Sequence, residues 1–195
     1  MSSTNRSNAR ETHISDYYIT PIEKIEEFLK PFISLEGNIF EGKKILDCCA
    51  GGDEINPMSY PIALNKVANV SLDNITTIDV REDSRANIKG NYLEMDCKDK
   101  FDVIITNPPF NVSLDIIKKA LNDVKEGGYC IFLLRLNYFG SKARKPFWEE
   151  NMAKYTFVHS QRICFTNNGK TDSIEYMHLV FKKGYKEEYT KLMVI

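Results

Sequence analysis

Asn107-Pro108-Pro109-Phe110 is the stretch of this chain whose residue types are best suited to chemistry. It follows the apolar, β-branched run of residues 101–106. Two prolines end such a strand because proline cannot donate to a continuing ladder, and each holds the residue before it extended. The tetrapeptide therefore predicts a rigid loop at the carboxyl end of a buried strand, where open α/β sheets bind their ligands.

This loop carries an amide at Asn107, a carbonyl at Pro108 and an aromatic ring at Phe110. An amide oxygen and a loop carbonyl can accept both hydrogens of an NH2 group, while the aromatic ring stacks on the planar system that bears it. The pattern favours a site for a planar ring with an amino group. A plain turn after a strand is the alternative, because short motifs also occur by chance.

A second candidate loop lies upstream, where residues 43–53 predict a strand followed by small residues. The loop includes Cys49, Ala50 and Gly51, and small residues let the backbone approach a ligand closely. A loop after a first strand typically holds a nucleotide-like cofactor. The spacing is not G-x-G-x-x-G and no Lys-Ser/Thr pair follows, so a dinucleotide or triphosphate site is disfavoured.

Two acidic residues occupy matching positions at the ends of predicted strands. Asp79 lies at the end of the strand predicted over residues 75–81, and Asp96 ends a short third strand over residues 91–96. An acid at the first position can accept both ribose hydroxyls of an adenosine, and Asp96 is a candidate partner for the adenine amino group. Isolated acids are more often solvated turn residues or caps, but the matching positions favour binding.

Thr20 and Pro21 predict the start of a helix, with Thr20 as the N-cap and proline at the first helical position. Apolar residues then recur at helical spacing over residues 22–29, and Pro31 is the expected end. The loop before this helix carries Tyr18, which either packs in the core or covers a ligand.

The second half of the chain predicts a helix after the prolines and then a central buried strand over residues 129–136. Residues 137–148 mix basic and aromatic side chains and can contact phosphate and stack on bases. A solvated loop whose Phe147 and Trp148 cover the core is equally supported. The candidate nucleic-acid contacts are Lys142, Arg144 and Lys145, with Lys170 in a later turn.

Residues 162–181 predict a hairpin at one sheet edge, with a turn over residues 167–170. His159 and His178 have no metal or nucleophile partner at a telling spacing, so we expect structural roles for both.

Composition narrows the class of protein. The 195 residues fit one domain, and the net charge of −1 gives no global attraction to nucleic acid. Five cysteines without ligand spacing favour reduced, mostly buried thiols over zinc or disulfides. Neither a signal peptide nor a membrane span is evident, so we expect a cytoplasmic protein with a flexible polar arm over residues 1–12 and one domain over residues 13–195.

The order of these features resembles the class I S-adenosylmethionine-dependent methyltransferases. Within them it is similar to the N6-adenine DNA methyltransferases, most of all to small phage-type members, with Asn107-Pro108-Pro109-Phe110 as the most specific part. The resemblance implies one Rossmann-like α/β domain with a mostly parallel seven-stranded sheet and an antiparallel terminal hairpin. The chain then has no room for a separate target-recognition domain. If a phage encodes the chain, the protein is expected in the cytoplasm of the host.

The resemblance also implies roles for the candidate residues. The cofactor is S-adenosyl-L-methionine, with Asp79 at the ribose and Asp96 at the adenine. Asn107 and Pro108 would hold the target amino group, and Phe110 would stack on the target base. The remaining cofactor-binding candidates are Tyr18, Thr20, Asp47, Cys49, Ala50, Gly51 and also Asn107, and Pro109 completes the catalytic loop.

The family's last loop glycine is Asp53 here, which puts the cofactor loop in doubt. The implied substrate is DNA with a flipped-out adenine, and we expect neither a metal nor a membrane. Methylation of an RNA base or of a glutamine amide remains open, as does a non-catalytic subunit of a methyltransferase complex. Without a target-recognition domain, sequence specificity could be low, supplied by the loop over residues 137–148, or borrowed from a second subunit in a homodimer or a complex with a partner.

Overall fold

Eight strands form one sheet in the computed structural model, which describes residues 18–165, 173–186 and 188–195. They are β1 (Ile45–Asp47), β2 (Ile75–Asp79), β3 (Ile88–Lys89), β4 (Val103–Thr106), β5 (Tyr129–Arg135), β6 (Tyr155–Val158), β7 (Tyr176–Lys182) and β8 (Lys191–Val194). Their order is β3-β2-β1-β4-β5-β7-β6-β8. The strands from β1 to β5 pair in parallel, whereas β7 is antiparallel to both β5 and β6. The mostly parallel sheet is confirmed, with eight strands instead of seven.

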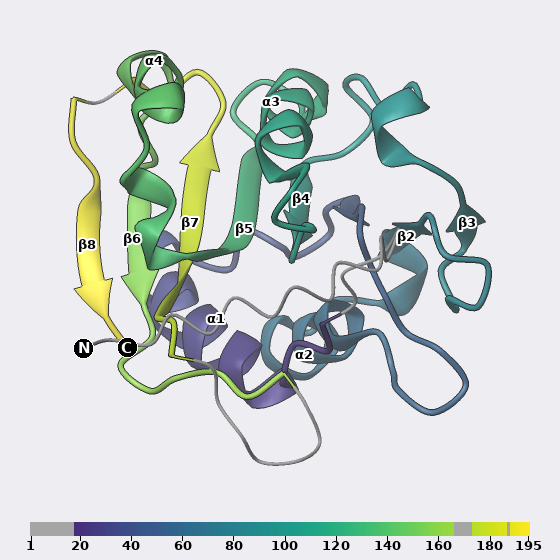
Figure 1. Cartoon of the computed structure of the whole chain (residues 1–195). Coiled ribbons are helices and arrows are strands. Elements are labelled where there is room, and N and C mark those ends of the chain that lie inside the picture. Colours follow the sequence, from purple (N-terminus) through teal and green to yellow (C-terminus); the bar gives the residue numbers. More distant parts are fainter. Residues whose placement is uncertain (1–17, 166–172, 187) are drawn as a thin grey trace, which may run out of the picture.

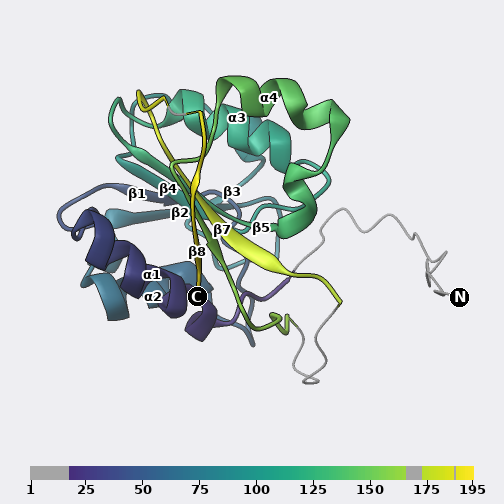
Figure 2. The same cartoon turned by 90° about the vertical axis from the view of Figure 1, so that its left-hand side faces the viewer.

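Helices cover both faces of the sheet (Figures 1 and 2), with α1 and α2 on one side and α3 and α4 on the other. They are α1 (Ile22–Glu36), α2 (Ser59–Ala68), α3 (Ser113–Asp123) and α4 (Lys145–Glu150), with short 3-10 segments η1 (Leu72–Asn74), η2 (Tyr92–Glu94), η3 (Leu136–Phe139) and η4 (Lys142–Arg144). None of the helices in the described part of the chain is long and apolar enough to cross a membrane.

The central strands are buried from end to end because both faces of the sheet are covered. All four residues of β4 and six of the seven residues of β5 are buried, which explains their continuous apolar runs in the sequence. One hydrophobic cluster lies on each face, and Phe28, Leu29 and Phe32 of α1 are fully buried in one of them. The two clusters hold the carboxyl ends of β1 and β4 in fixed positions.

The first helix differs from the prediction at both ends. It begins at Ile22, its N-cap is Pro21, and no side chain caps it, so the capping role predicted for Thr20 is wrong. It also continues through Pro31 to Glu36. An interior proline loses one backbone hydrogen bond, but the buried apolar face on either side of Pro31 outweighs that cost.

Two strand predictions also need correction, and one strand was missed. Residues 91–96 form η2 instead of a strand, and the third parallel strand is β3. Residues 163–165 form no strand, so the antiparallel pair consists of β6 and β7. The edge strand β8 was not predicted, and the predicted turn at 167–170 lies outside the described residues.

Glu36 anchors the end of α1 to the sheet. Its carboxylate accepts hydrogen bonds from the hydroxyls of Tyr129 and Tyr155, both at 2.5 Å, and from Nζ of Lys154 at 2.7 Å. Burial raises the pKa of Glu36, but the hydrogen bonds from these three residues outweigh it and lower the pKa to about 2. The charged carboxylate therefore joins α1 to the starts of β5 and β6.

We expect Glu36→Gln to lower the free energy of unfolding at pH 7 by about 2 kcal/mol, since hydrogen bonds to the charged group are lost. A depressed folded-state pKa contributes stability above the unfolded pKa, and that stability is lost as the pH falls. The difference between wild type and variant in urea unfolding should therefore shrink between the ordinary pKa of 4.5 and about 2. Glu41→Gln, at an exposed position, is the control. A difference that does not change with pH would contradict this role of Glu36.

Candidate active site

The main cavity lies where the strand order reverses. Strand β1 has β2 on one side and β4 on the other, so the loops after β1 and β4 leave the sheet in different directions and open a crevice. A cavity of about 250 Å³ lies there, with Ala50, Gly51, Asn107 and Pro108 among its lining residues. Both loops singled out in the sequence thus meet at one site.

The loop after β1 is shaped by glycine. Gly51 and Gly52 have φ values of 62° and 72°, which favour glycine. A Cβ on Gly52 would lie only 2.6 Å from Cγ of Met58, so the loop also needs the missing side chain. Cys49 and Ala50 line the cavity as well, and Asp53 accepts hydrogen bonds from the backbone of Ile55 and Asn56, at 2.8 and 2.7 Å. The residue in place of the family's glycine therefore closes a turn.

Asp79 lies at the end of β2 and lines the cavity. Its Oδ2 accepts a hydrogen bond from the Gly51 N–H at 2.7 Å, and its Oδ1 accepts one from the Arg81 N–H at 2.9 Å. A carboxylate has about four lone-pair directions, so each oxygen keeps one for a ligand. Asp79 thus fixes the small-residue loop and still has acceptors for the cavity.

Asp96 does not line the cavity. Its side chain is 84% exposed and lies 3.7 Å from Nζ of Lys100. The predicted role of Asp96 at the adenine assumed that it ends a strand, whereas the strand ends earlier, at Lys89. The residues that follow β3 and line the cavity are Asn91, Tyr92 and Leu93, so they occupy the place predicted for Asp96.

Asp47 is fully buried and supports the loop from behind without lining the cavity. Its Oδ1 accepts a hydrogen bond from the Thr106 hydroxyl at 2.7 Å, whereas its Oδ2 has no hydrogen-bond partner among the described residues. Burial raises the pKa of Asp47 to about 7, against the lowering effect of the hydrogen bonds from Thr106 and Cys49.

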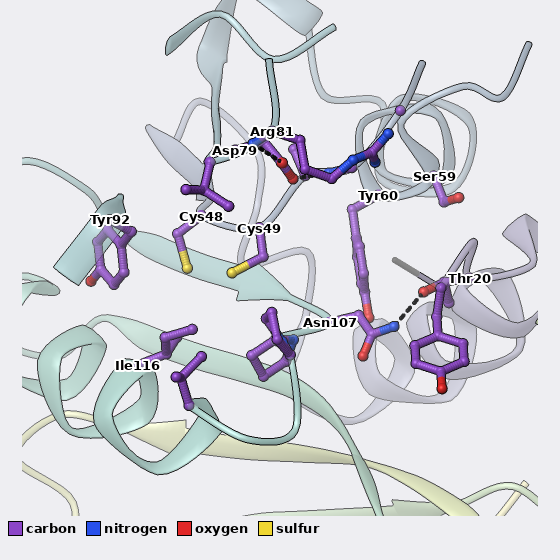
Figure 3. A pocket seen from close by; sticks show the side chains of 18 of the residues that line it. Thr20, Cys48, Cys49, Ser59, Tyr60, Asp79, Arg81, Tyr92, Asn107 and Ile116 are labelled. Atoms are coloured by element: carbon purple, nitrogen blue, oxygen red, sulfur yellow. Dashed lines mark hydrogen bonds between the residues drawn. The ribbon is translucent and has the colours of Figure 1, made fainter. Parts of the chain in front are cut away.

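The side chain of Asn107 has a defined orientation. Its Nδ2 donates a hydrogen bond to Oγ1 of Thr20 at 3.0 Å, and Figure 3 shows the amide oxygen turned away from Thr20. The oxygen is therefore left to accept hydrogen bonds from a ligand. Thr20 has this structural role in place of the predicted helix cap, and it lines the cavity together with Tyr18.

Phe110 lies outside the cavity lining and is half-buried. The guanidinium carbon of Arg135 is 4.1 Å from the centroid of its ring, and the ring of Tyr18 is 6.1 Å away. Arg135 covers the ring by a cation–π contact. Phe110 therefore lies beside Tyr18, which lines the cavity.

The packing of the basic segment 137–148 disagrees with the interpretation in which its aromatic side chains stack on bases. Phe147 and Trp148 are buried at 5% and 8% exposure, so they cover the core and are not available to stack on bases. Arg144 donates a hydrogen bond to the Tyr138 carbonyl at 2.7 Å, and Lys145 lies 3.4 Å from Glu149. Lys142 is exposed, and Lys170 lies outside the described residues.

Several lining residues were not predicted from the sequence. The most notable is Tyr60 in the first turn of α2, and others are Ser59, Arg81, Asn111, Val112 and Ile116. No local pattern marks them, because the fold brings them to the cavity from α2, from the segment after β2 and from the start of α3. Within the described ranges, no group of three or more His, Cys, Asp or Glu side chains is arranged to hold a metal ion.

Neither a protein-family model nor a curated protein sequence matches the chain. Solved structures do match it. One is a protein from Listeria monocytogenes assigned as a class I S-adenosylmethionine-dependent methyltransferase. It gives a TM-score of 0.56 and 15% identity, with 91% of this chain and 65% of that protein covered. A protein from Pyrococcus horikoshii assigned as an RNA methyltransferase gives a TM-score of 0.61 and 19% identity, with 86% and 88% covered.

The M protein of the type I restriction enzyme EcoKI gives a TM-score of 0.57 and 14% identity, with 84% of this chain and 47% of that protein covered. The chain therefore spans less than two thirds of the Listeria and EcoKI proteins. At these identities the likeness concerns the fold. The chain has the fold of the class I S-adenosylmethionine-dependent methyltransferases.

Proposed function

We propose that this chain transfers a methyl group from S-adenosylmethionine to the N6 amino group of adenine in DNA. The observation that carries the proposal is the fixed amide of Asn107. Because Nδ2 is engaged by Thr20, Oδ1 is left to accept a hydrogen bond beside Pro108 at the cavity. The fold likeness to the EcoKI M protein, part of a restriction enzyme, favours DNA as the substrate.

The cavity residues fit the cofactor. Asp79 has acceptors left for the ribose hydroxyls, and Tyr92 and Leu93 follow β3 at the expected place of the adenine. Gly51 and Gly52 let the backbone approach the methionine part. The Oδ2 of Asp47, which has no hydrogen-bond partner in the described part of the chain, places negative charge behind that loop when the carboxyl group is ionised. When bound, S-adenosylmethionine supplies an electrophilic methyl group on a sulfonium.

The chain activates a poor nucleophile through oriented acceptors. The N6 lone pair of adenine is delocalised into the ring, and acceptance of both amino hydrogens by Asn107 Oδ1 and the Pro108 carbonyl favours a pyramidal nitrogen. Positive charge that develops on N6 is then stabilised by preorganised dipoles. Alignment of the reacting atoms supplies much of the remaining rate, so no strong general base is required.

A base in a duplex can reach this loop only after it flips out of the stack. Phe110 would replace the stacking that the base loses. In the structure the Phe110 ring contacts Arg135 at 4.1 Å and neighbours Tyr18 and Tyr176 at 6.1 and 6.2 Å between centroids, so a base would stack beside these side chains.

RNA is the second candidate substrate, favoured by the TM-score of 0.61 with the Pyrococcus horikoshii protein assigned as an RNA methyltransferase. The same acceptors would serve an amino group on an RNA base. They would also serve a glutamine side-chain amide, since each is an NH2 on a planar group.

Incubation of the purified chain with labelled S-adenosylmethionine and duplex DNA, single-stranded DNA or total RNA tests the proposal directly. We expect N6-methyladenine in DNA after nucleoside analysis. Label found in RNA alone would mean that RNA is the substrate and that the proposed mechanism still applies. Cofactor binding without methylation of nucleic acid would overturn the proposal, and a glutamine amide or a partner-dependent role would then be tested.

Asn107→Ala should lower kcat about 100-fold to 1000-fold, as expected for loss of a group that stabilises charge in the transition state. The dissociation constant for S-adenosylmethionine, measured by calorimetry, should change less than about threefold, since such a group acts mainly in the transition state. Thr20→Val keeps the side-chain shape but removes the acceptor for Asn107 Nδ2, so we expect an intermediate loss in kcat. Equal losses of turnover and cofactor affinity in Asn107→Ala would contradict the assigned role.

Asp79→Asn should weaken S-adenosylmethionine binding about 10-fold to 100-fold, because hydrogen bonds to a charged group contribute roughly 1.5–3 kcal/mol. The exposed Asp73→Asn is the matched control and should bind normally. A melting temperature recorded for each variant separates lost affinity from lost folding. Unchanged affinity in folded Asp79→Asn would exclude Asp79 from the ribose site.

A further inference from the structure

A chain of buried polar side chains runs from the outside of α1 to the wall of the cavity. The hydroxyl oxygen of Tyr60 lies 3.1 Å from Nε2 of His178, and Nδ1 of His178 lies 2.9 Å from Nε2 of His159. Nδ1 of His159 lies 3.6 Å from Oε2 of Glu27, an ion-pair contact longer than a hydrogen bond, and has no hydrogen-bond partner among the described residues. The same Glu27 oxygen accepts a hydrogen bond from Nζ of Lys24 at 2.7 Å. Tyr60 lines the cavity, whereas the Glu27 side chain is 42% exposed.

Both imidazoles in this row of buried side chains, those of His159 and His178, are neutral. His178 is fully buried between the sheet and α1, stacked on Phe28 at 4.2 Å between centroids, and His159 is 3% exposed. Burial lowers the pKa of His178 well below its ordinary value and that of His159 to about 4. A neutral imidazole carries one N–H and one acceptor nitrogen, so each ring donates once and accepts once.

The carboxylate at the outer end favours one direction for the hydrogen bonds of this network. Glu27 has no hydrogen to donate, so its negative charge favours the N–H of His159 on the facing Nδ1. Nε2 of His159 then accepts from Nδ1–H of His178, and Nε2 of His178 accepts the hydroxyl hydrogen of Tyr60. The Tyr60 oxygen then has no hydrogen left to donate and can only accept a hydrogen bond from a ligand.

We propose that Tyr60 is a cofactor-binding residue whose oxygen accepts a hydrogen bond from the α-ammonium group of S-adenosylmethionine. Glu27, His159 and His178 are positioning residues that hold the hydroxyl hydrogen away from the ligand. This inference rests on the proposed function, because it assumes that S-adenosylmethionine occupies the cavity.

The surroundings of Tyr60 favour a cation over the neutral amino group of a target base. Oδ2 of Asp47 is buried without a hydrogen-bond partner among the described residues. Burial and then the charge of Asp47 raise the pKa of Tyr60, so the two groups are close in electrostatic terms. The Tyr60 acceptor and the charge of Asp47 behind the loop together favour a positively charged donor, whereas the acceptors assigned to the amino group of the base, Asn107 Oδ1 and the Pro108 carbonyl, belong to the loop after β4.

The first test compares three ligands on wild type and Tyr60→Phe by calorimetry. We expect the variant to bind S-adenosylmethionine and its decarboxylated analogue about tenfold more weakly, since one charge-assisted hydrogen bond is lost. Binding of 5′-methylthioadenosine, which lacks the ammonium group, should not change. Equal weakening of all three ligands, or of none, would overturn the inference.

The second test addresses the outer end of the chain. Glu27→Gln can donate as well as accept, so it releases the constraint on the tautomers. We expect about threefold weaker binding of S-adenosylmethionine in the wild-type background and no further loss in Tyr60→Phe, because coupled residues are not additive. Glu23→Gln, at an exposed position on the same helix, is the control. Additive losses would show that Glu27 does not act through Tyr60.

Nitrogen-15 NMR of labelled histidine gives a readout that does not depend on activity. The chain has three histidines, so variants at each position assign the signals. We expect the Nδ1–H tautomer for both His159 and His178, and Nε2–H in either would overturn the inference. If wild type bound none of the three ligands, the proposed function would fail, whereas normal binding with the wrong tautomers would count against this inference alone.

Discussion

A buried hydrogen bond between Thr106 and Asp47 holds the two halves of the candidate site together. The Thr106 hydroxyl donates to Oδ1 of Asp47 at 2.7 Å and accepts from the Cys49 N–H at 3.1 Å, and both side chains are fully buried. Asp47 ends β1 and Thr106 ends β4, the neighbouring strands at which the strand order reverses. The small-residue loop follows the first strand and Asn107 follows the second, so this contact sets the distance between the two loops.

The burial of Asp47 imposes a cost on the fold. Burial raises the pKa of Asp47 to about 7, and a carboxyl group whose folded pKa is raised stabilises the fold only in its protonated form. Near neutral pH the charged Asp47, with Oδ2 unpartnered among the described residues, therefore opposes folding. Such costs concentrate at functional sites, and a cationic ligand in the adjacent cavity would offset this one.

Local sequence patterns were sufficient where local physics determines structure. The β-branched runs gave β4 and β5, and the two prolines after residue 106 identified the loop that reaches the cavity. Patterns failed where the partner is distant in sequence. The strand predicted at residues 91–96 is a 3-10 segment, because pairing with β2 is completed earlier at Lys89. His159 and His178 had no partner at a telling spacing, since the fold alone brings them together with Tyr60.

Helix α1 shows why both kinds of information are needed. The residues before it and along it reach the sheet at three places: Thr20 contacts Asn107, Glu27 faces His159, and Glu36 binds Tyr155. These polar contacts fix the helix along its axis, while Phe28 and Phe32 fix it against the sheet. The backbone hydrogen bond lost at Pro31 is a small cost by comparison. A helix held at both ends keeps Thr20 within hydrogen-bond distance of Asn107. At about 1.5 Å per residue, the far end of this helix is more than about 20 Å away. The orientation of the Asn107 amide therefore depends on packing at that far end.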